Sequence, residues 1–177
     1  VLHTASAVLM PWRNRVAAIV DAWYPGQQSG AAIAQTLFGD VDPSGRLPVT
    51  FPASESQGPT AVPTRYPGIG NVAHYSEGLL VGYRYYDRFH QAPLFPFGYG
   101  LSYTSFSLAH LKLSAQRGGG FSATVAVRNT GRRAGAEVVQ AYLSFPPAAA
   151  QGVRKSVPRS GRFANRPAGP SPHKLPV

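Results

Sequence analysis

The stretch AWYPGQQSGAAIAQTLFGDVDPSGRLPVTFP, residues 22–52, carries the secondary-structure signals that decide the fold of this chain of 177 residues. It predicts a short helix over 29–38, with Ser29 as its cap and Gly39 as the residue that ends it. Three apolar side chains are expected to form the buried stripe of this helix: Ile33, Leu37 and Phe38. The turn formers that follow lead into a strand predicted over 47–51.

A second helix is predicted before this one, over residues 11–24. Five apolar side chains fall at i, i+4, i+7, i+8 and i+11, which lines one helical face: Trp12, Val16, Ile19, Val20 and Trp23. Pro11 suits the first turn of such a helix, and Pro25 with Gly26 would stop it. Because residues 1–9 resemble the end of a strand, the order is strand, helix, helix, strand. This order is typical of the closing part of an α/β layer.

Residues 53–73 are poor in large apolar side chains and rich in Pro, Gly, Ser and Thr, which predicts a long loop. The stretch that follows is dense in aromatic rings, with seven Tyr or Phe side chains between Tyr75 and Phe97. Rings at this density either wall a site that stacks a planar or sugar-like ligand or pack one layer against another. We favour packing.

From Phe106 onward the pattern is that of β-strands. Residues 121–128 alternate between inward and outward side chains, and the runs 108–113 and 137–145 are also rich in strand formers. The glycines 118–120 have no following helix or Lys, so they predict a hairpin turn and not a phosphate loop. Three strands are fewer than the roughly seven of an immunoglobulin-like sandwich, so this module is expected to be incomplete.

Charge is unevenly distributed along the chain. It carries 17 Lys and Arg against 7 Asp and Glu, a net charge of +10, but residues 152–177 hold six of the basic residues and no acid. Residues 1–151 therefore have 11 basic and 7 acidic residues, a net charge of +4. The tail is rich in Pro and poor in large apolar side chains, which predicts disorder. It could contact phosphates, but without interleaved aromatic residues we expect it to be only solvated.

Composition excludes several classes of site. Without Cys the chain has no disulfides, thiolate zinc sites or cysteine nucleophiles. The longest strictly apolar run, 16–20, is far shorter than the roughly 18 residues of a membrane helix, and the opening VLHTASAVLMPW lacks the order of a signal peptide. The His residues are scattered without HxxxH spacing, so no metal site is predicted.

Three acidic residues, in two places along the chain, are candidates for chemistry. Asp40 and Asp42 could present carboxylates to a divalent cation, but the Pro-Ser-Gly that follows favours a turn in which Asp side chains accept backbone N–H groups. Glu77, with Arg84 and Asp87 at i+7 and i+10, could be a general acid, yet we favour an ion pair that orients a loop. Retaining glycoside hydrolysis needs two carboxyl groups about 5 to 5.5 Å apart, and no pair here is compelling.

Three stretches together resemble one family: residues 22–52, YSEGLLVGYRYYD at 75–87 and PLFPFGYGLSYTSF at 93–106. They look like the carboxyl-terminal part of bacterial glycoside hydrolase family 3 β-glucosidases. VAVRNTGRRAGAEVVQAYLSFP, residues 125–146, is similar to the start of the fibronectin type III-like module of that family. The resemblance spans about residues 1–147.

The resemblance implies an α/β fold class, in which a partial α/β sandwich is followed by an incomplete immunoglobulin- or fibronectin type III-like β-sandwich. Residues 1–105 would be the carboxyl-terminal part of the family's α/β sandwich domain with its crossover segment. Residues 106–151 would be the truncated fibronectin type III-like domain, and 152–177 the disordered basic tail.

The resemblance also implies the chemistry of the parent enzyme, which is retaining hydrolysis of terminal β-glucosyl or related residues without a metal or organic cofactor. The family's nucleophile is an Asp in an amino-terminal (β/α)8 barrel, and its acid/base Glu lies upstream of the WYPGQ motif. Neither position exists in this sequence, so no catalytic, cofactor-binding or metal-binding residue is assigned, and the chain alone is expected to be inactive.

The partners expected for the parent are a β-glucoside or oligosaccharide substrate and the missing barrel domain, with no membrane or nucleic-acid partner. We expect a periplasmic or secreted location for the parent. Two alternatives are a stand-alone carbohydrate-binding module that uses Tyr85 and Tyr86, and a nucleic-acid binder that uses the tail. Since the tail departs from the family pattern, we interpret it as a frameshift, with a natural linker as the alternative.

Overall fold

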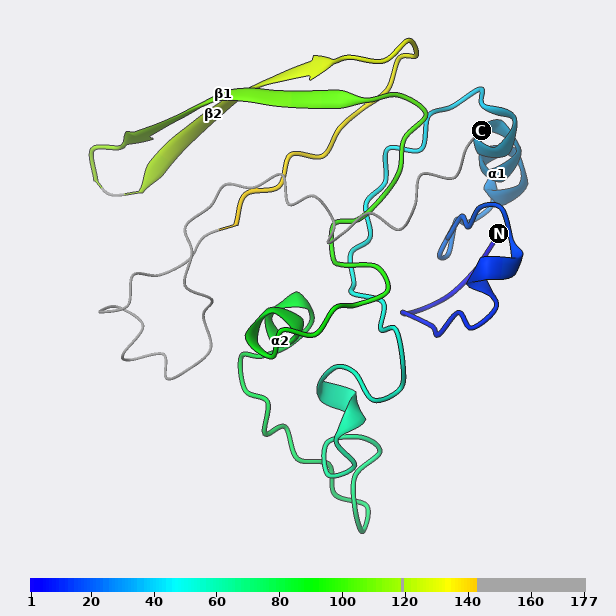
Figure 1. Ribbon diagram of the computed structural model, residues 1–177, viewed down its shortest axis with the longest axis vertical. Coiled ribbons are helices and arrows are strands. Elements are labelled where there is room, and N and C mark those ends of the chain that lie inside the picture. Colours follow the sequence, from blue (N-terminus) through cyan, green and yellow to red (C-terminus); the bar gives the residue numbers. More distant parts are fainter. Residues whose placement is uncertain (119, 143–177) are drawn as a thin grey trace. The chain divides into compact units, whose positions relative to one another are not determined.

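The computed structural model describes residues 1–118 and 120–142, which fall into two compact units (Figure 1). Among the described residues, unit 1 comprises Val1–Gln27, Arg46–Tyr99 and 140–142, and unit 2 comprises Gln28–Gly45 and Gly100–Val139. The tail 152–177 lies outside the described residues. None of the helices in the described part has the length and apolar character to span a bilayer.

Unit 1 consists mostly of loops and contains three short helical elements. These are the 3-10 helices η1 (Arg13–Arg15) and η2 (Pro59–Ala61) and the helix α2 (Tyr83–Arg88). The loop predicted over 53–73 is confirmed apart from the single turn of η2. Helix α2 was not anticipated from the sequence.

The helix predicted over residues 11–24 is wrong. Only η1 forms there, and the chain is already extended at Val16, with φ −128° and ψ 147°. Asp21 instead makes a parallel bridge with Leu2, and its carboxylate accepts bonds from the Thr4 hydroxyl at 2.9 Å and the Trp23 N–H at 3.0 Å. Trp23 adopts a left-handed φ of 51°, which a continuing helix excludes. The Asp21 bonds therefore outcompete the helical ladder.

The strand predicted over 47–51 is reduced to one antiparallel bridge, between Phe51 and Phe95. The two segments do run side by side, since the Leu47 N–H donates to the Tyr99 carbonyl at 2.8 Å and the Phe51 N–H donates to the Phe95 carbonyl at 2.8 Å. Pro48 has no N–H to donate, which interrupts the ladder between these bonds.

The core of unit 1 forms around Phe51, which is 1% exposed. Its ring lies 6.1 Å from that of Trp23 and 6.3 Å from that of Phe95. In the described residues, only four apolar side chains are buried: Met10, Phe51, Tyr85 and Tyr86. The apolar burial that stabilises the unit is therefore small.

Unit 2 contains the helix α1 (Ser29–Phe38), whose predicted bounds are confirmed. Gly39 ends it in the left-handed region, with φ 83°, and its N–H donates to the carbonyls of the last turn. Ser29 does not cap it, because the helix begins at Ser29 and no side-chain capping bond forms.

The buried stripe predicted for α1 is wrong, because Leu37 is 53% and Phe38 85% exposed and no residue of the helix is buried. The described residues of unit 2 contain no second helix and only one hairpin. Among the described residues of unit 2, no other helix or strand therefore buries the apolar side chains of α1.

The hairpin of unit 2 joins β1 (Phe106–Ala115) to β2 (Phe121–Asn129) in antiparallel register, from Phe106 opposite Asn129 to Ala115 opposite Phe121. The register shifts between Ala109 and Lys112, where His110 adopts a left-handed φ of 55°, the backbone conformation found in G1-type β-bulges. Two of the three predicted strands are confirmed and pair with each other as a hairpin, while Gly119 of the predicted turn lies outside the described residues. The third, 137–145, forms no strand over 137–142, and its remainder lies outside the described residues.

Asp42 connects the segment after α1 to the segment before β1 within unit 2. Its carboxylate accepts the Tyr103 N–H at 2.6 Å and lies 2.9 Å from the Ser102 hydroxyl. The prediction placed this carboxylate in a local turn, but the backbone N–H that it binds lies 61 residues along the chain. The Tyr103 hydroxyl also donates to the Thr36 carbonyl at 2.7 Å.

We expect the isolated chain to unfold over a broad temperature range, because so few apolar side chains are buried and a lone two-stranded hairpin is only marginally stable. Differential scanning calorimetry measures this directly. A single sharp transition whose calorimetric and van't Hoff enthalpies agree would contradict the expectation.

Replacing Asp42 by Ala should increase hydrogen exchange at the Tyr103 amide about tenfold, since losing a charge-assisted bond costs about 1.5 kcal/mol. Asp40→Ala is the matched control, because the Asp40 side chain is exposed and only its backbone N–H bonds within the turn. Two-dimensional NMR gives the exchange rates. Equal exchange rates at the Tyr103 amide in the two variants would show that the Asp42 carboxylate does not protect this amide.

Candidate functional site

The aromatic stretch of unit 1 is mainly a packing device. Tyr85 and Tyr86 are 8% and 6% exposed, and the Tyr85 ring lies 4.5 Å from that of Phe89. Tyr83 lies 5.3 Å from Phe97. The predicted packing role is confirmed for Tyr85 and Tyr86, whose side chains are almost entirely covered.

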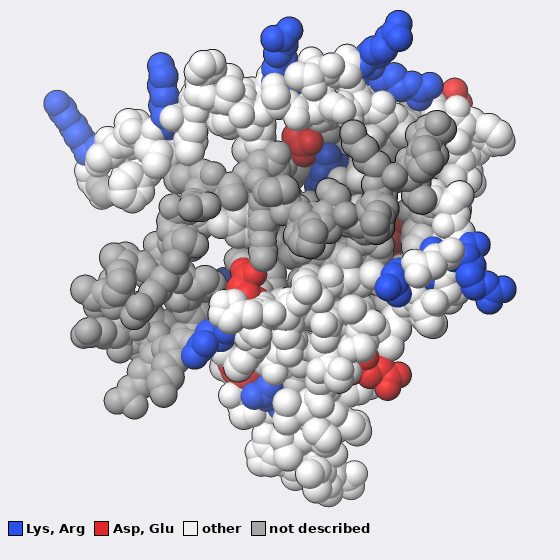
Figure 2. All heavy atoms as spheres, viewed as in Figure 1, with Lys and Arg blue, Asp and Glu red and all other residues white. Residues whose placement is uncertain are grey.

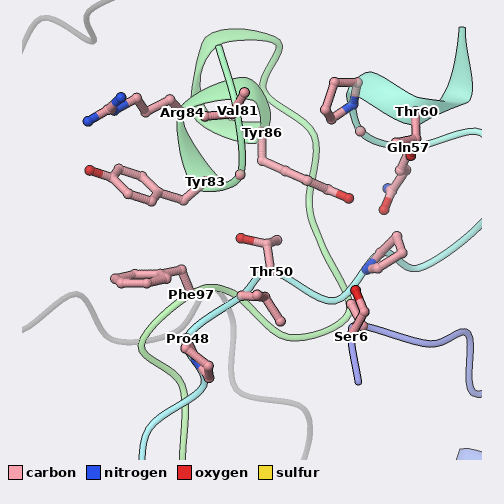
Figure 3. Close-up of a pocket in the computed structure, with 16 residues that line it drawn as sticks. Ser6, Pro48, Thr50, Gln57, Thr60, Val81, Tyr83, Arg84, Tyr86 and Phe97 are labelled. Atoms are coloured by element: carbon pink, nitrogen blue, oxygen red, sulfur yellow. The ribbon is translucent and has the colours of Figure 1, made fainter. Parts of the chain in front are cut away.

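Beside these rings unit 1 contains a pocket of about 500 Å3 (Figure 3). Its walls come from the segment around the Phe51 bridge, the loop at η2 and the start of α2. The residues that line it include Pro48, Thr50, Val81, Tyr83, Tyr86 and Phe97. One charged side chain, that of Arg84, and no carboxylate belong to its lining. The lining therefore supplies neither of the two carboxyl groups that glycoside hydrolysis requires.

Thr50 is the unusual polar residue of this pocket. It is 9% exposed, and its hydroxyl has no hydrogen-bond partner among the described residues. Figure 3 shows that hydroxyl directed into the pocket, on the side where Tyr83 and Phe97 lie. A buried hydroxyl without a partner destabilises the fold, and because this oxygen is itself covered, a group in the pocket does not reach it in this arrangement.

Tyr86 forms another part of the wall. Gly58, with φ +82°, lies so close that a Cβ atom there would be 3.0 Å from the Tyr86 hydroxyl oxygen. Burial, followed by the neighbouring Tyr85, raises the pKa of the Tyr86 phenol above its ordinary value. The phenol is therefore neutral at physiological pH and can donate a hydrogen bond but cannot act as a base.

Glu77 forms the predicted ion pair, but its partner is Arg65 and not Arg84. The Glu77 carboxylate lies 3.6 Å from the Arg65 Nε, which also donates to the Ser76 hydroxyl at 2.9 Å. The Arg65 guanidinium lies over the Tyr85 ring, 5.8 Å from its centre. Arg65 comes from the long loop, where nothing in the local sequence indicated its partner. The pair fixes that loop onto the aromatic stretch.

The remaining candidates gather into no second site. Asp42 is held by Ser102 and Tyr103, and within residues 1–118 and 120–142 no three His, Asp or Glu side chains come together as metal ligands. Figure 2 shows the basic side chains of the hairpin standing apart from one another on the visible face, not in a continuous patch. That hairpin face offers no basic groove of the kind that follows a phosphate backbone.

More than half of the chain matches a known protein family. The model of the glycosyl hydrolase family 3 C-terminal domain matches residues 1–103. The match ends three residues before β1 begins at Phe106.

Relatives and solved structures match along more of the chain. A β-glucosidase of Rhizobium radiobacter is 47% identical over 150 residues, which cover 82% of this chain and 18% of the relative. A probable β-glucosidase I of Aspergillus oryzae is 45% identical over 154 residues, with coverage of 82% and 18%. Because bacterial and fungal proteins both match, the expected resemblance to bacterial members is not specific.

Among solved structures, the β-glucosidase DesR of Streptomyces venezuelae, in complex with D-glucose, matches with a TM-score of 0.70 and 51% identity. That match covers 73% of this chain and 17% of DesR. β-Glucosidase 3B of Thermotoga neapolitana matches with a TM-score of 0.67 and 41% identity, covering 73% of this chain and 18% of its own. The chain thus spans about a fifth of the length of these proteins. It belongs to glycoside hydrolase family 3 and carries sequence of that family's carboxyl-terminal domain.

Proposed function

We propose that this chain is the carboxyl-terminal part of a β-glucosidase, which cleaves terminal β-linked glucosyl or related residues from β-glucosides or oligosaccharides. The observation that carries the proposal is the 47% identity over 150 residues with the Rhizobium radiobacter β-glucosidase. The matched region is 18% of that relative, so most of the enzyme lies outside the region compared.

In this proposal the catalytic carboxylates lie in other parts of the enzyme, as the family resemblance implies. Two candidates in this chain have structural roles instead, since Asp42 accepts the Tyr103 N–H and Glu77 pairs with Arg65. A retaining mechanism would need two carboxyl groups about 5 to 5.5 Å apart on either side of the scissile bond. The chain's own contribution is to complete the domain beside the catalytic parts.

We also propose how the chain divides into domains. Residues 1–105 would close an α/β sandwich, and residues 106–151 would begin a fibronectin type III-like module. The end of the family match at residue 103 and the start of the hairpin at Phe106 support a boundary near 105. The alternative of a stand-alone carbohydrate-binding module loses its proposed contacts, because Tyr85 and Tyr86 are buried.

The isolated chain should release no 4-nitrophenol from 4-nitrophenyl β-D-glucoside above the rate without protein. The reason is that the chemistry requires two carboxylates that this chain does not supply. Absorbance at 405 nm measures release, and the variant Glu77→Gln is the matched control. Turnover that copurifies with the chain and falls at least 100-fold in Glu77→Gln would defeat the proposal.

A chimera tests whether this chain can serve as the carboxyl-terminal part of an active β-glucosidase. In the Rhizobium radiobacter β-glucosidase, the region matched by this chain is exchanged for the corresponding residues of this chain, and the rest is retained. We expect kcat/KM for the same substrate within about tenfold of the parent, since catalysis depends on correctly placed groups outside the exchanged region. A folded chimera without turnover would contradict it.

A further inference from the structure

The chain contains a single Asp–Pro peptide bond, between Asp42 and Pro43. It lies after α1 and outside any helix or strand, and both residues are only partly buried. Proline has no N–H in a peptide bond, and its nitrogen accepts a proton more readily than that of an ordinary amide. An Asp carboxylate can act as a nucleophile. This bond therefore places a nucleophile beside a good leaving group.

The carboxylate of an Asp is tethered within reach of the carbonyl carbon of its own residue. An Oδ atom of Asp42 would form a bond to that carbon and close a five-membered cyclic anhydride. The bond from the carbon to the Pro43 nitrogen would break, and its electron pair would stay on the nitrogen, which takes a proton from solvent. One water molecule then opens the anhydride. The net reaction is hydrolysis of one peptide bond, and the intramolecular attack makes it faster than attack by water alone.

In folded unit 2 the Asp42 carboxylate is engaged by other groups. The Ser102 hydroxyl lies 2.9 Å from each of its oxygens, and the Tyr103 N–H donates to one of them at 2.6 Å. Gly135 packs against the same group, since a Cβ atom there would lie 2.5 Å from Oδ2. Hydrogen bonds to an ionised carboxylate are strong and stabilise its charge. Breaking them to turn an oxygen onto the carbonyl carbon adds to the barrier for attack.

Arg133 helps to hold the donors of these bonds in place. Its Nη1 atom donates to the Gly39 carbonyl at 3.0 Å, and its guanidinium lies 5.8 Å from the centre of the Tyr103 ring. The Tyr103 hydroxyl donates to the Thr36 carbonyl at 2.7 Å. These contacts hold the segment that carries Tyr103 against the end of α1. The restraint on the Asp42 carboxylate therefore lasts only while unit 2 is folded.

We propose that the Asp42–Pro43 bond is a self-cleavage site, in which the Asp42 carboxylate is the nucleophile and its bonds to Ser102 and Tyr103 suppress the reaction in the folded chain. Cleavage would give a fragment 1–42 that ends shortly after α1 and a fragment that begins at Pro43. The inference goes beyond the proposed function and does not depend on it. Unfolding of unit 2 in mild acid would become irreversible, because the cut separates α1 from the rest of the unit.

Intact-mass spectrometry of the full chain in mildly acidic buffer, with an inhibitor of acid proteases present, tests the site. In guanidinium chloride at the same pH, fragments 1–42 and 43–177 should form at least tenfold faster than in buffer alone, where circular dichroism monitors the fold. Asp42→Glu should slow cleavage of the unfolded chain at least tenfold, because the longer side chain has to close a six-membered ring.

Removing a donor tests the restraint. Ser102→Ala should accelerate cleavage of the folded chain at least threefold, because the Asp42 carboxylate loses the hydroxyl that contacts both of its oxygens. Ser107→Ala, at an exposed position of β1, is the matched control and should not change the rate. In guanidinium chloride the original chain and both Ser variants should cleave at the same rate, since the restraint is then absent.

Three results would overturn the inference. An unfolded chain that stays intact between Asp42 and Pro43, or that breaks only at other bonds, would remove the site. Cleavage of Asp42→Glu as fast as that of the original chain would show that the Asp42 carboxylate is not the nucleophile. Equal rates for the folded and unfolded chain, or for the two folded Ser variants, would refute the restraint by unit 2.

Discussion

Unit 1 depends on the burial of Phe51. This residue is 1% exposed, and it connects three segments that are distant in sequence, through its ring contacts with Trp23 and Phe95 and its backbone bonds to Phe95. Side chains of consecutive extended residues point to opposite sides. Fixing Phe51 in the core therefore directs Thr50 away from it and into the pocket. One apolar contact thus determines both the stability of the unit and the position of its unsatisfied donor.

The sequence could predict the elements whose signals are local. Helix α1 ends where Gly39 adopts a left-handed φ, and the hairpin follows the alternation of residues 121–128. The helix expected over 11–24 does not form, because the Asp21 carboxylate accepts hydrogen bonds from the Thr4 hydroxyl and the Trp23 N–H that hold the chain in another conformation. Those bonds depend on the fold around them, and residue spacing carries no information about them.

In the candidate site, too, the sequence could predict some features, whereas others depend on how distant segments fold together. An ion pair for Glu77 could be expected from its chemistry, but the choice of Arg65 depends on how the long loop folds back onto Tyr85. The aromatic rings were recognisable as a packing device, whereas the pocket next to them had no signature in the sequence. Nothing in the local sequence distinguishes Thr50, and the lack of a partner for its buried hydroxyl emerges only from the fold around it.

The hairpin has a further consequence for any protein that carries it. In the described residues, β1 pairs only with β2, so each strand keeps one edge of backbone N–H and carbonyl groups without a strand beside it. Leu113, Phe121 and Val127 are between 46% and 74% exposed on these strands. Open edges with apolar side chains template intermolecular β-sheet. Proteolysis that released this hairpin would therefore produce material prone to fibrillar assembly.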